Sequence, residues 1–161
     1  MTRRELSFLV LGLAAGAAAT VFAHGGDKAD AVDSRPAFLP SGVYAWDALP
    51  VEKTQSGERR AVFDSATATL DRLETHVTTL DAGTAPHAAH RHPDEELIFV
   101  REGAIEATIN GVAHTAPAGS IIFYAANDLH GMRNAGSAKA SYFVLRWTSP
   151  GKEGPKPGGS R

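Results

Sequence analysis

The stretch HRHPDEELIFVREG, residues 90–103, combines metal-ligand residue types with a strand signal. Two histidines stand two residues apart, and a proline, three carboxylates and an apolar run follow them. Alternate side chains of a strand point to the same face, so His90, His92 and Glu96 share their face with the inward apolar residues, provided that the register survives the proline. Two imidazoles and a carboxylate in an apolar interior suit Mn, Fe, Ni, Cu or Zn and not Ca. Burying them without a metal would cost free energy.

Short apolar or alternating runs with turn signals between them surround this stretch. The dipeptide Asn110-Gly111 is typical of a two-residue hairpin turn, because both positions require a positive φ angle. The predicted strands are residues 72–80, 95–100, 104–109, 112–116, 120–124 and 140–147. Strands spaced in this way predict an all-β antiparallel sandwich or barrel. Helix is expected only as a turn or two near residues 46–52.

A fourth metal ligand has to come from another part of the sequence, and His130 is the candidate. It follows a polar loop that comes after the apolar run at residues 120–124.

These residues resemble the two conserved motifs of the cupin superfamily, in its small one-domain form. The first motif is similar to residues 83–103, with His90, His92, Glu96 and Gly103, and the second to residues 111–134, with Gly111, Pro117, Gly119, His130 and Asn134. One residue more than usual separates Gly83 from His90, and ten residues separate Gly119 from His130. Neither departure removes a ligand.

The resemblance implies a double-stranded β-helix, or jelly-roll barrel, that holds one divalent metal ion through His90, His92, Glu96 and His130. About two positions of an octahedral ion would stay open for water, dioxygen or a chelating substrate. Mn or Fe is favoured and Ni, Cu and Zn are possible, because folded export would load the metal in the cytoplasm, where availability and not affinity decides its identity.

Several polar residues outside the ligand set are candidates for the cavity. His76 shares its strand face with Glu74, Thr78 and Leu80, and is a candidate substrate or proton-transfer group. Arg146 alternates with large apolar residues and is a candidate partner for a substrate carboxylate, the alternative being a surface arginine. His87 is expected at the exposed surface, with a place at the cavity mouth as the alternative. Asp94 and Glu95 are expected to be solvated, with the alternative that either orients an imidazole of the ligand set.

Composition and the chain ends limit the partners, the ligand types and the location that we expect for the protein. The formal net charge of -2 provides no basic face for nucleic acid, and the absence of cysteine excludes disulfides and thiolate ligands.

Residues 1–23 have paired arginines followed by an uncharged run, which resembles a twin-arginine export signal. This resemblance predicts a periplasmic or secreted protein that has no membrane segment after the signal is cleaved. An uncleaved anchor is the alternative. We expect a mobile segment at residues 24–41, the folded domain at 42–149 and a disordered tail at 150–161.

The fold does not decide the reaction, so two hypotheses stay open. The first is an exported metal-dependent enzyme, of the dioxygenase or the lyase or decarboxylase type, acting on a small oxygenated molecule. The second is a non-catalytic, metal-dependent binding protein for a small ligand. In either case we expect a homodimer that pairs through an edge strand.

Overall fold

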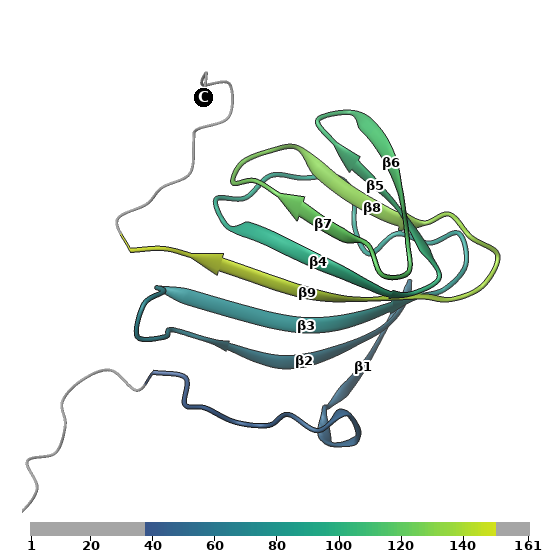
Figure 1. The fold of residues 1–161 in the computed structure, drawn as a ribbon. Helices are drawn as coiled ribbons and strands as arrows, with labels where there is room; N and C mark the ends of the chain where they lie inside the picture. Colours follow the sequence, from purple (N-terminus) through teal and green to yellow (C-terminus); the bar gives the residue numbers. More distant parts are fainter. Residues whose placement is uncertain (1–37, 151–161) are drawn as a thin grey trace, which may run out of the picture. The chain divides into compact units, whose positions relative to one another are not determined.

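The computed structural model describes residues 38–150, and nearly all of their regular structure is β-strand (Figure 1). The predicted export signal at residues 1–23 lies outside the described residues, as do residues 24–37 and 151–161 of the two predicted terminal segments. A 3-10 turn at Trp46–Ala48 falls within the range where helix was expected. The strands are β1 (Val51–Thr54), β2 (Gly57–Ser65), β3 (Arg72–Leu80), β4 (Glu95–Glu102), β5 (Ala104–Ile109), β6 (Val112–Pro117), β7 (Ile121–Tyr124), β8 (His130–Asn134) and β9 (Ala140–Thr148).

The strands form two antiparallel sheets. One has six strands in the order β1-β2-β3-β9-β4-β7, and the other has three in the order β6-β5-β8. The chain leaves the larger sheet after β4, forms the β5–β6 hairpin, returns as β7, crosses again as β8 and ends in the centre of the larger sheet as β9 (Figure 1). The prediction of an all-β jelly-roll fold with little helix is confirmed.

The core consists of the alternate residues of each strand that face inward. On β4, Ile98 and Val100 are fully buried whereas Phe99 is 41% exposed, so the face predicted to carry the ligands is the inner face. The cluster combines residues from both sheets, namely Leu80, Ile98, Val100, Ile105, Ala107, Ala116, Ile122, Tyr124, Ala140, Tyr142 and Val144. Burial of this apolar surface holds the two sheets together.

Two turns have the backbone geometry that their residues predict. Asn110 and Gly111 have φ angles of 49° and 87°, and they join β5 to β6 with Ile109 opposite Val112. Gly103, between β4 and β5, has a φ angle of 73°, and a Cβ atom there would lie 2.9 Å from the Cβ of Ala140. Glycine at position 103 is therefore required both by the backbone conformation and by close packing.

Three strands were not predicted from the sequence. β1 and β2 carry charged residues at many positions and are exposed or only partly buried, so they lack a clean alternation. β8 contains His130, Gly131 and Asn134 and has few β-branched or aromatic residues, but it pairs with β5 along its whole length. Tertiary pairing outweighs weak local propensity in these segments. Among residues 38–150, no helical segment has the length and apolar character needed to cross a membrane.

Candidate metal centre

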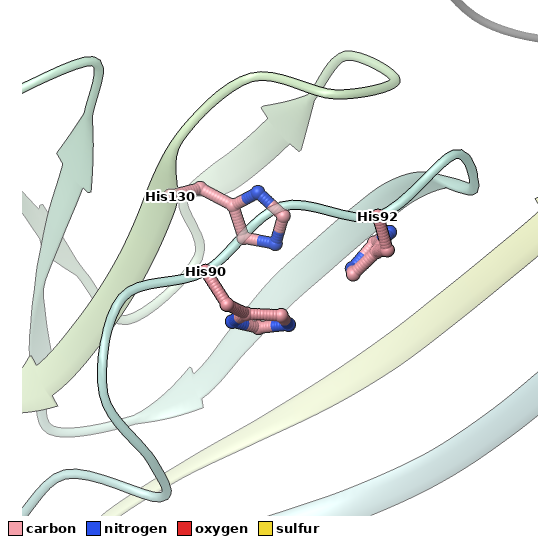
Figure 2. A group of neighbouring side chains, drawn as sticks. All are labelled: His90, His92 and His130. Atoms are coloured by element: carbon pink, nitrogen blue, oxygen red, sulfur yellow. The ribbon is translucent and has the colours of Figure 1, made fainter. Parts of the chain in front are cut away.

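Backbone pairing brings the three predicted histidine ligands together (Figure 2). His90 and His92 lie in the segment before β4, and His130 is the first residue of β8. The backbone N–H of His90 donates to the carbonyl of His130 at 2.9 Å, and the N–H of His130 donates back to the carbonyl of His90 at 3.0 Å. This isolated bridge fixes the distance between two segments that are far apart in the sequence.

The imidazoles of His90, His92 and His130 form a compact group, the histidine cluster. One ligand nitrogen from each ring lies within 4.8 Å of the others. The ring centroids are 5.1 Å apart for His90 and His92, 4.8 Å for His90 and His130, and 4.7 Å for His92 and His130. Figure 2 shows the three rings converging on one region.

Backbone carbonyls orient two of the rings. Nδ1 of His92 lies 3.1 Å from the carbonyl oxygen of Asp94, and Nδ1 of His130 lies 2.9 Å from that of Asp128. A carbonyl only accepts, so each Nδ1 carries the proton and each Nε2 keeps a free lone pair. This is the arrangement that metal-binding imidazoles usually have.

The nitrogens left over have no hydrogen-bond partner within the protein. Nε2 of His92, Nε2 of His130 and Nδ1 of His90 are all buried and unpaired. Buried polar atoms are almost always hydrogen-bonded, and an unpaired one costs free energy. A cation bound by the histidine cluster would satisfy these atoms, so the residues present fit a metal ion.

The protonation states also favour metal binding. Burial lowers the pKa of His90 and His130, so both rings are neutral near pH 7. Glu96, on β4, borders the cluster with its Oε2 3.3 Å from Nε2 of His92. Burial alone raises the pKa of Glu96, but the contact with His92 and the charge of Arg146 outweigh it, and the net pKa is lowered. The carboxylate is therefore ionised.

Tyr124 holds His130 in place. Its ring stacks on the imidazole with a centroid distance of 4.4 Å and an interplanar angle of 20°. Its hydroxyl donates to the carbonyl of Gly131 at 3.0 Å, and the side chain is fully buried. Because Tyr124 and Glu96 are cross-strand partners, β7 and β4 position the histidine and the carboxylate together.

The histidine cluster lies against a cavity of about 300 Å³. His90, Glu96 and His130 line it. Such a volume is at the lower end of the range for small-molecule sites.

Comparison with known proteins shows what the domain is similar to. Residues 76–146 match the family described as the Cupin domain. This part of the chain is therefore similar to a cupin domain. None of the curated proteins matches the chain.

Solved structures share the fold of this chain at low sequence identity. An RmlC-like cupin from Shewanella frigidimarina is 17% identical with a TM-score of 0.56, over 69% of this chain and 95% of that one. A predicted oxalate decarboxylase from Thermotoga maritima is 15% identical with a TM-score of 0.56, over 66% and 99%. KdgF from a Halomonas species is 17% identical with a TM-score of 0.54, over 65% and 94%. At these identities the likeness concerns the fold alone.

The other sequence candidates also lie at this cavity. His76 and Arg146 both line it, and their proposed roles stay predictions. His87 is exposed and contributes to the lining, with its ring centroid 4.4 Å from that of His90. The two alternatives for His87 are therefore both partly realised, since it lies at the surface and at the cavity.

The expectation for Asp94 was wrong. Its side chain is buried and not solvated, and its Oδ2 lies 3.0 Å from Nε of Arg146 and 3.6 Å from an Nη atom of Arg72. The two arginines come from β9 and β3, so the ion pairs depend on strand pairing that the local sequence does not show. Glu95 is partly buried.

Sequence reasoning also missed a charged group next to the metal site, which we name the Glu74 group: Arg59, Glu74, His76 and Arg146. All four side chains line the cavity. Glu74 is buried, and its Oε1 lies 2.8 Å from an Nη atom of Arg59 and 2.7 Å from Nδ1 of His76. The shared strand face of Glu74 and His76 was the one signal of this group in the sequence.

Proposed function

We propose that the protein is a metal-dependent enzyme that acts on a small oxygenated molecule in the cavity beside the histidine cluster. The observation that carries the proposal is the set of three buried, unpaired imidazole nitrogens, two of which belong to residues that line this cavity, His90 and His130. The ionisable Glu74 group lines the same space, which is where acid–base chemistry would require it.

The metal would be held by His90, His92 and His130, with Glu96 as the fourth ligand. Imidazole nitrogen and carboxylate oxygen suit Mn or Fe, which we favour, and also Ni, Cu and Zn. When bound, such an ion supplies a Lewis acid with open positions for a chelating substrate. Elemental analysis of protein purified from its native compartment tests the identity, and a calcium-only content would contradict the donor set.

Two reaction classes fit this arrangement, namely a dioxygenase and a lyase or decarboxylase. Both need a metal that binds adjacent oxygens of the substrate and a site that stabilises the negative charge that develops. Oxygen consumption and release of carbon dioxide, measured with small carboxylates and 2-oxo acids, distinguish the classes.

The decisive experiment compares the metal-loaded protein with the same protein after removal of the metal by a chelator. Turnover that disappears on chelation and returns with the metal supports the enzyme. Turnover that persists without metal contradicts it. A ligand that raises the melting temperature of the metal-loaded protein and is recovered unchanged points instead to a binding protein.

We also propose that the protein is exported through the twin-arginine route to the periplasm or beyond, and that it forms a homodimer through an edge strand. Export is supported by the sequence of residues 1–23. For the dimer, β7 is an edge of the six-stranded sheet, and its Ile121 and Phe123 are 59% and 49% exposed. Sedimentation as a monomer at micromolar concentration would contradict the dimer, and a cytoplasmic fraction with residues 1–23 intact would contradict export.

A further inference from the structure

Strand β3 places a histidine and a glutamate in the cavity, outside the proposed ligand set. Glu74 and His76 stand two residues apart on the inner face, and Nδ1 of His76 is 2.7 Å from Oε1 of Glu74. The Glu74 side chain is only 4% exposed and the His76 side chain 18% exposed. The pair is therefore held in one geometry and partly shielded from water.

The charges around Glu74 fix the proton positions in this pair. Burial raises the pKa of Glu74, but the hydrogen bond from His76 and the charges of Arg146 and Arg59 outweigh it, and the pKa is lowered. An ionised carboxylate can only accept, so Nδ1 of His76 carries the proton. The lone pair of Nε2 is then available as a base.

The charge of the cavity indicates what it binds. Among the lining residues, Arg59 and Arg146 balance Glu74 and Glu96 when the histidines are neutral. A divalent metal ion at the histidine cluster adds two positive charges, so the loaded cavity attracts an anion. Arg146 lies between the two regions, since it is the cross-strand partner of both Glu74 and Glu96.

We propose that His76, oriented by Glu74, is the proton-transfer residue of this cavity, and that the substrate is a small carboxylate with a C–H bond next to a carbonyl group. The assignment rests on the proposed metal-dependent function. The C–H bond breaks, its proton passes to Nε2 of His76, and its electron pair moves into the enolate of the substrate. Return of a proton from the imidazolium to the same carbon restores the ring. Glu74 is a positioning residue that stabilises the imidazolium and fixes its tautomer.

The probe is pyruvate, which has a carboxylate, a neighbouring carbonyl and exchangeable methyl protons. Exchange of these protons for deuterium in D₂O, followed by proton NMR, reports base catalysis without knowledge of the natural substrate. We expect the Mn- or Zn-loaded wild-type protein to accelerate the exchange, and His76→Asn to lower the rate by about 100-fold or more, since general base catalysis typically contributes 10²–10⁴-fold. His114→Asn is the matched control, because His114 is exposed on β6 and does not line this cavity.

Further measurements separate the role of His76 as a base from metal binding and from the positioning role of Glu74. Metal content of His76→Asn stays at the wild-type level, because His76 is outside the ligand set. Other charged or titratable groups share the cavity with His76 and could affect its activity. They are Arg59, Glu74, His87, Tyr142 and Arg146 and the proposed ligands His90, Glu96 and His130. The tautomer of His76 is therefore read directly from the ¹⁵N chemical shifts of its ring. Glu74→Gln is expected to lose part of the exchange rate and to shift the His76 ring away from the Nδ1–H tautomer, which a purely structural role would not do.

The outcomes distinguish this inference from the proposed function. Exchange that is as fast in His76→Asn as in the wild type overturns the assignment of His76, whatever the metal does. Metal-loaded wild-type protein that leaves the methyl protons of pyruvate in place also overturns it. Exchange that needs His76 but persists after chelation contradicts the metal-dependent function and leaves the base assignment standing.

Discussion

The histidine cluster, through His90 and His130, and the Glu74 group border one cavity, but the two regions differ in which of their polar atoms still lack a partner. In the histidine cluster, three buried nitrogens have no partner within the protein. In the Glu74 group, Oε2 of Glu74 and Nε of Arg146 also lack a hydrogen bond, but each charge has an opposite charge nearby: Arg59 and Arg146 lie 2.8 and 3.9 Å from carboxylate oxygens of Glu74, and Arg146 lies 3.0 Å from Asp94. The first region is complete only with a cation, whereas the second is nearly neutral by itself.

Because of this difference, the histidine cluster should act mainly on metal binding and the Glu74 group mainly on the stability of the fold. Unpaired buried atoms raise the free energy of the metal-free fold, and a bound ion lowers it again. Ion pairs within a partly exposed network contribute to the fold without any ligand, although each contributes modestly. Mutations in the two regions should therefore produce different patterns of metal affinity and unfolding free energy.

The largest effect is expected from His130→Ala. Loss of one imidazole should weaken metal binding by more than about 100-fold, which exceeds what substitution of residues behind the ligands usually costs. Isothermal titration with Mn²⁺ or Zn²⁺ measures it, and His114→Ala, at an exposed position of β6, is the control. A variant that binds the metal as tightly as the wild type would remove His130 from the site.

The next effect is the stabilisation that metal gives to the wild-type fold. At a free metal concentration of 100 times the Kd, the unfolding free energy should rise by about 2.7 kcal/mol. The same increment is expected in Glu74→Gln, because Glu74 is not a ligand, and none in His130→Ala. Denaturant titrations with and without metal test this, and an increment that disappears in Glu74→Gln would mean that the two regions are coupled.

A smaller effect is expected on the metal-free stability of Glu74→Gln. The substitution removes a buried negative charge and leaves Arg59 without its partner, at a cost of about 1–3 kcal/mol. Because the pKa of Glu74 in the fold lies below its ordinary value of 4.5, the carboxylate stabilises the fold above that value and loses this contribution as the pH falls through the lower folded pKa.

The unfolding free energy of the wild type should therefore fall more steeply below pH 4.5 than that of Glu74→Gln. Comparison of the two proteins cancels the titration of other carboxyl groups. Parallel curves over this range would show that the fold does not lower the pKa of Glu74.

The sequence predicted the parts of this molecule that local pattern determines. The strand expected at residues 72–80 is β3 from Arg72 to Leu80, and the one expected at 104–109 is β5, because alternation and the Asn110-Gly111 turn set their limits. The histidines of the cluster were predicted from their spacing and from the cupin resemblance. Spacing also placed Glu96 and Ile98 on one face.

The parts that were missed depend on which strands lie side by side. Glu74, Arg146 and Glu96 form a cross-strand row only because β9 inserts between β3 and β4. No periodicity within β3 or β9 reveals that neighbour. Asp94 was expected to be solvated for the same reason, since the arginines that pair with it come from other strands.

Asp94 also provides the smallest and sharpest test of the difference between the two regions, because it contacts one residue of each, His92 and Arg146. Its backbone carbonyl accepts from Nδ1 of His92 at 3.1 Å, while its carboxylate pairs with Arg146 and stays 4.0 Å from the same Nδ1. Asp94→Asn keeps the carbonyl and removes the charge, so we expect a loss of about 1 kcal/mol of stability and a change in metal affinity of less than roughly tenfold. Glu95→Gln, at a partly buried neighbouring position, controls for the change of charge. A loss of metal affinity of about 100-fold in Asp94→Asn, and not in Glu95→Gln, would show that the carboxylate of Asp94 orients His92. The ion pairs of Asp94 would then be part of the metal centre, and the two regions would act as one.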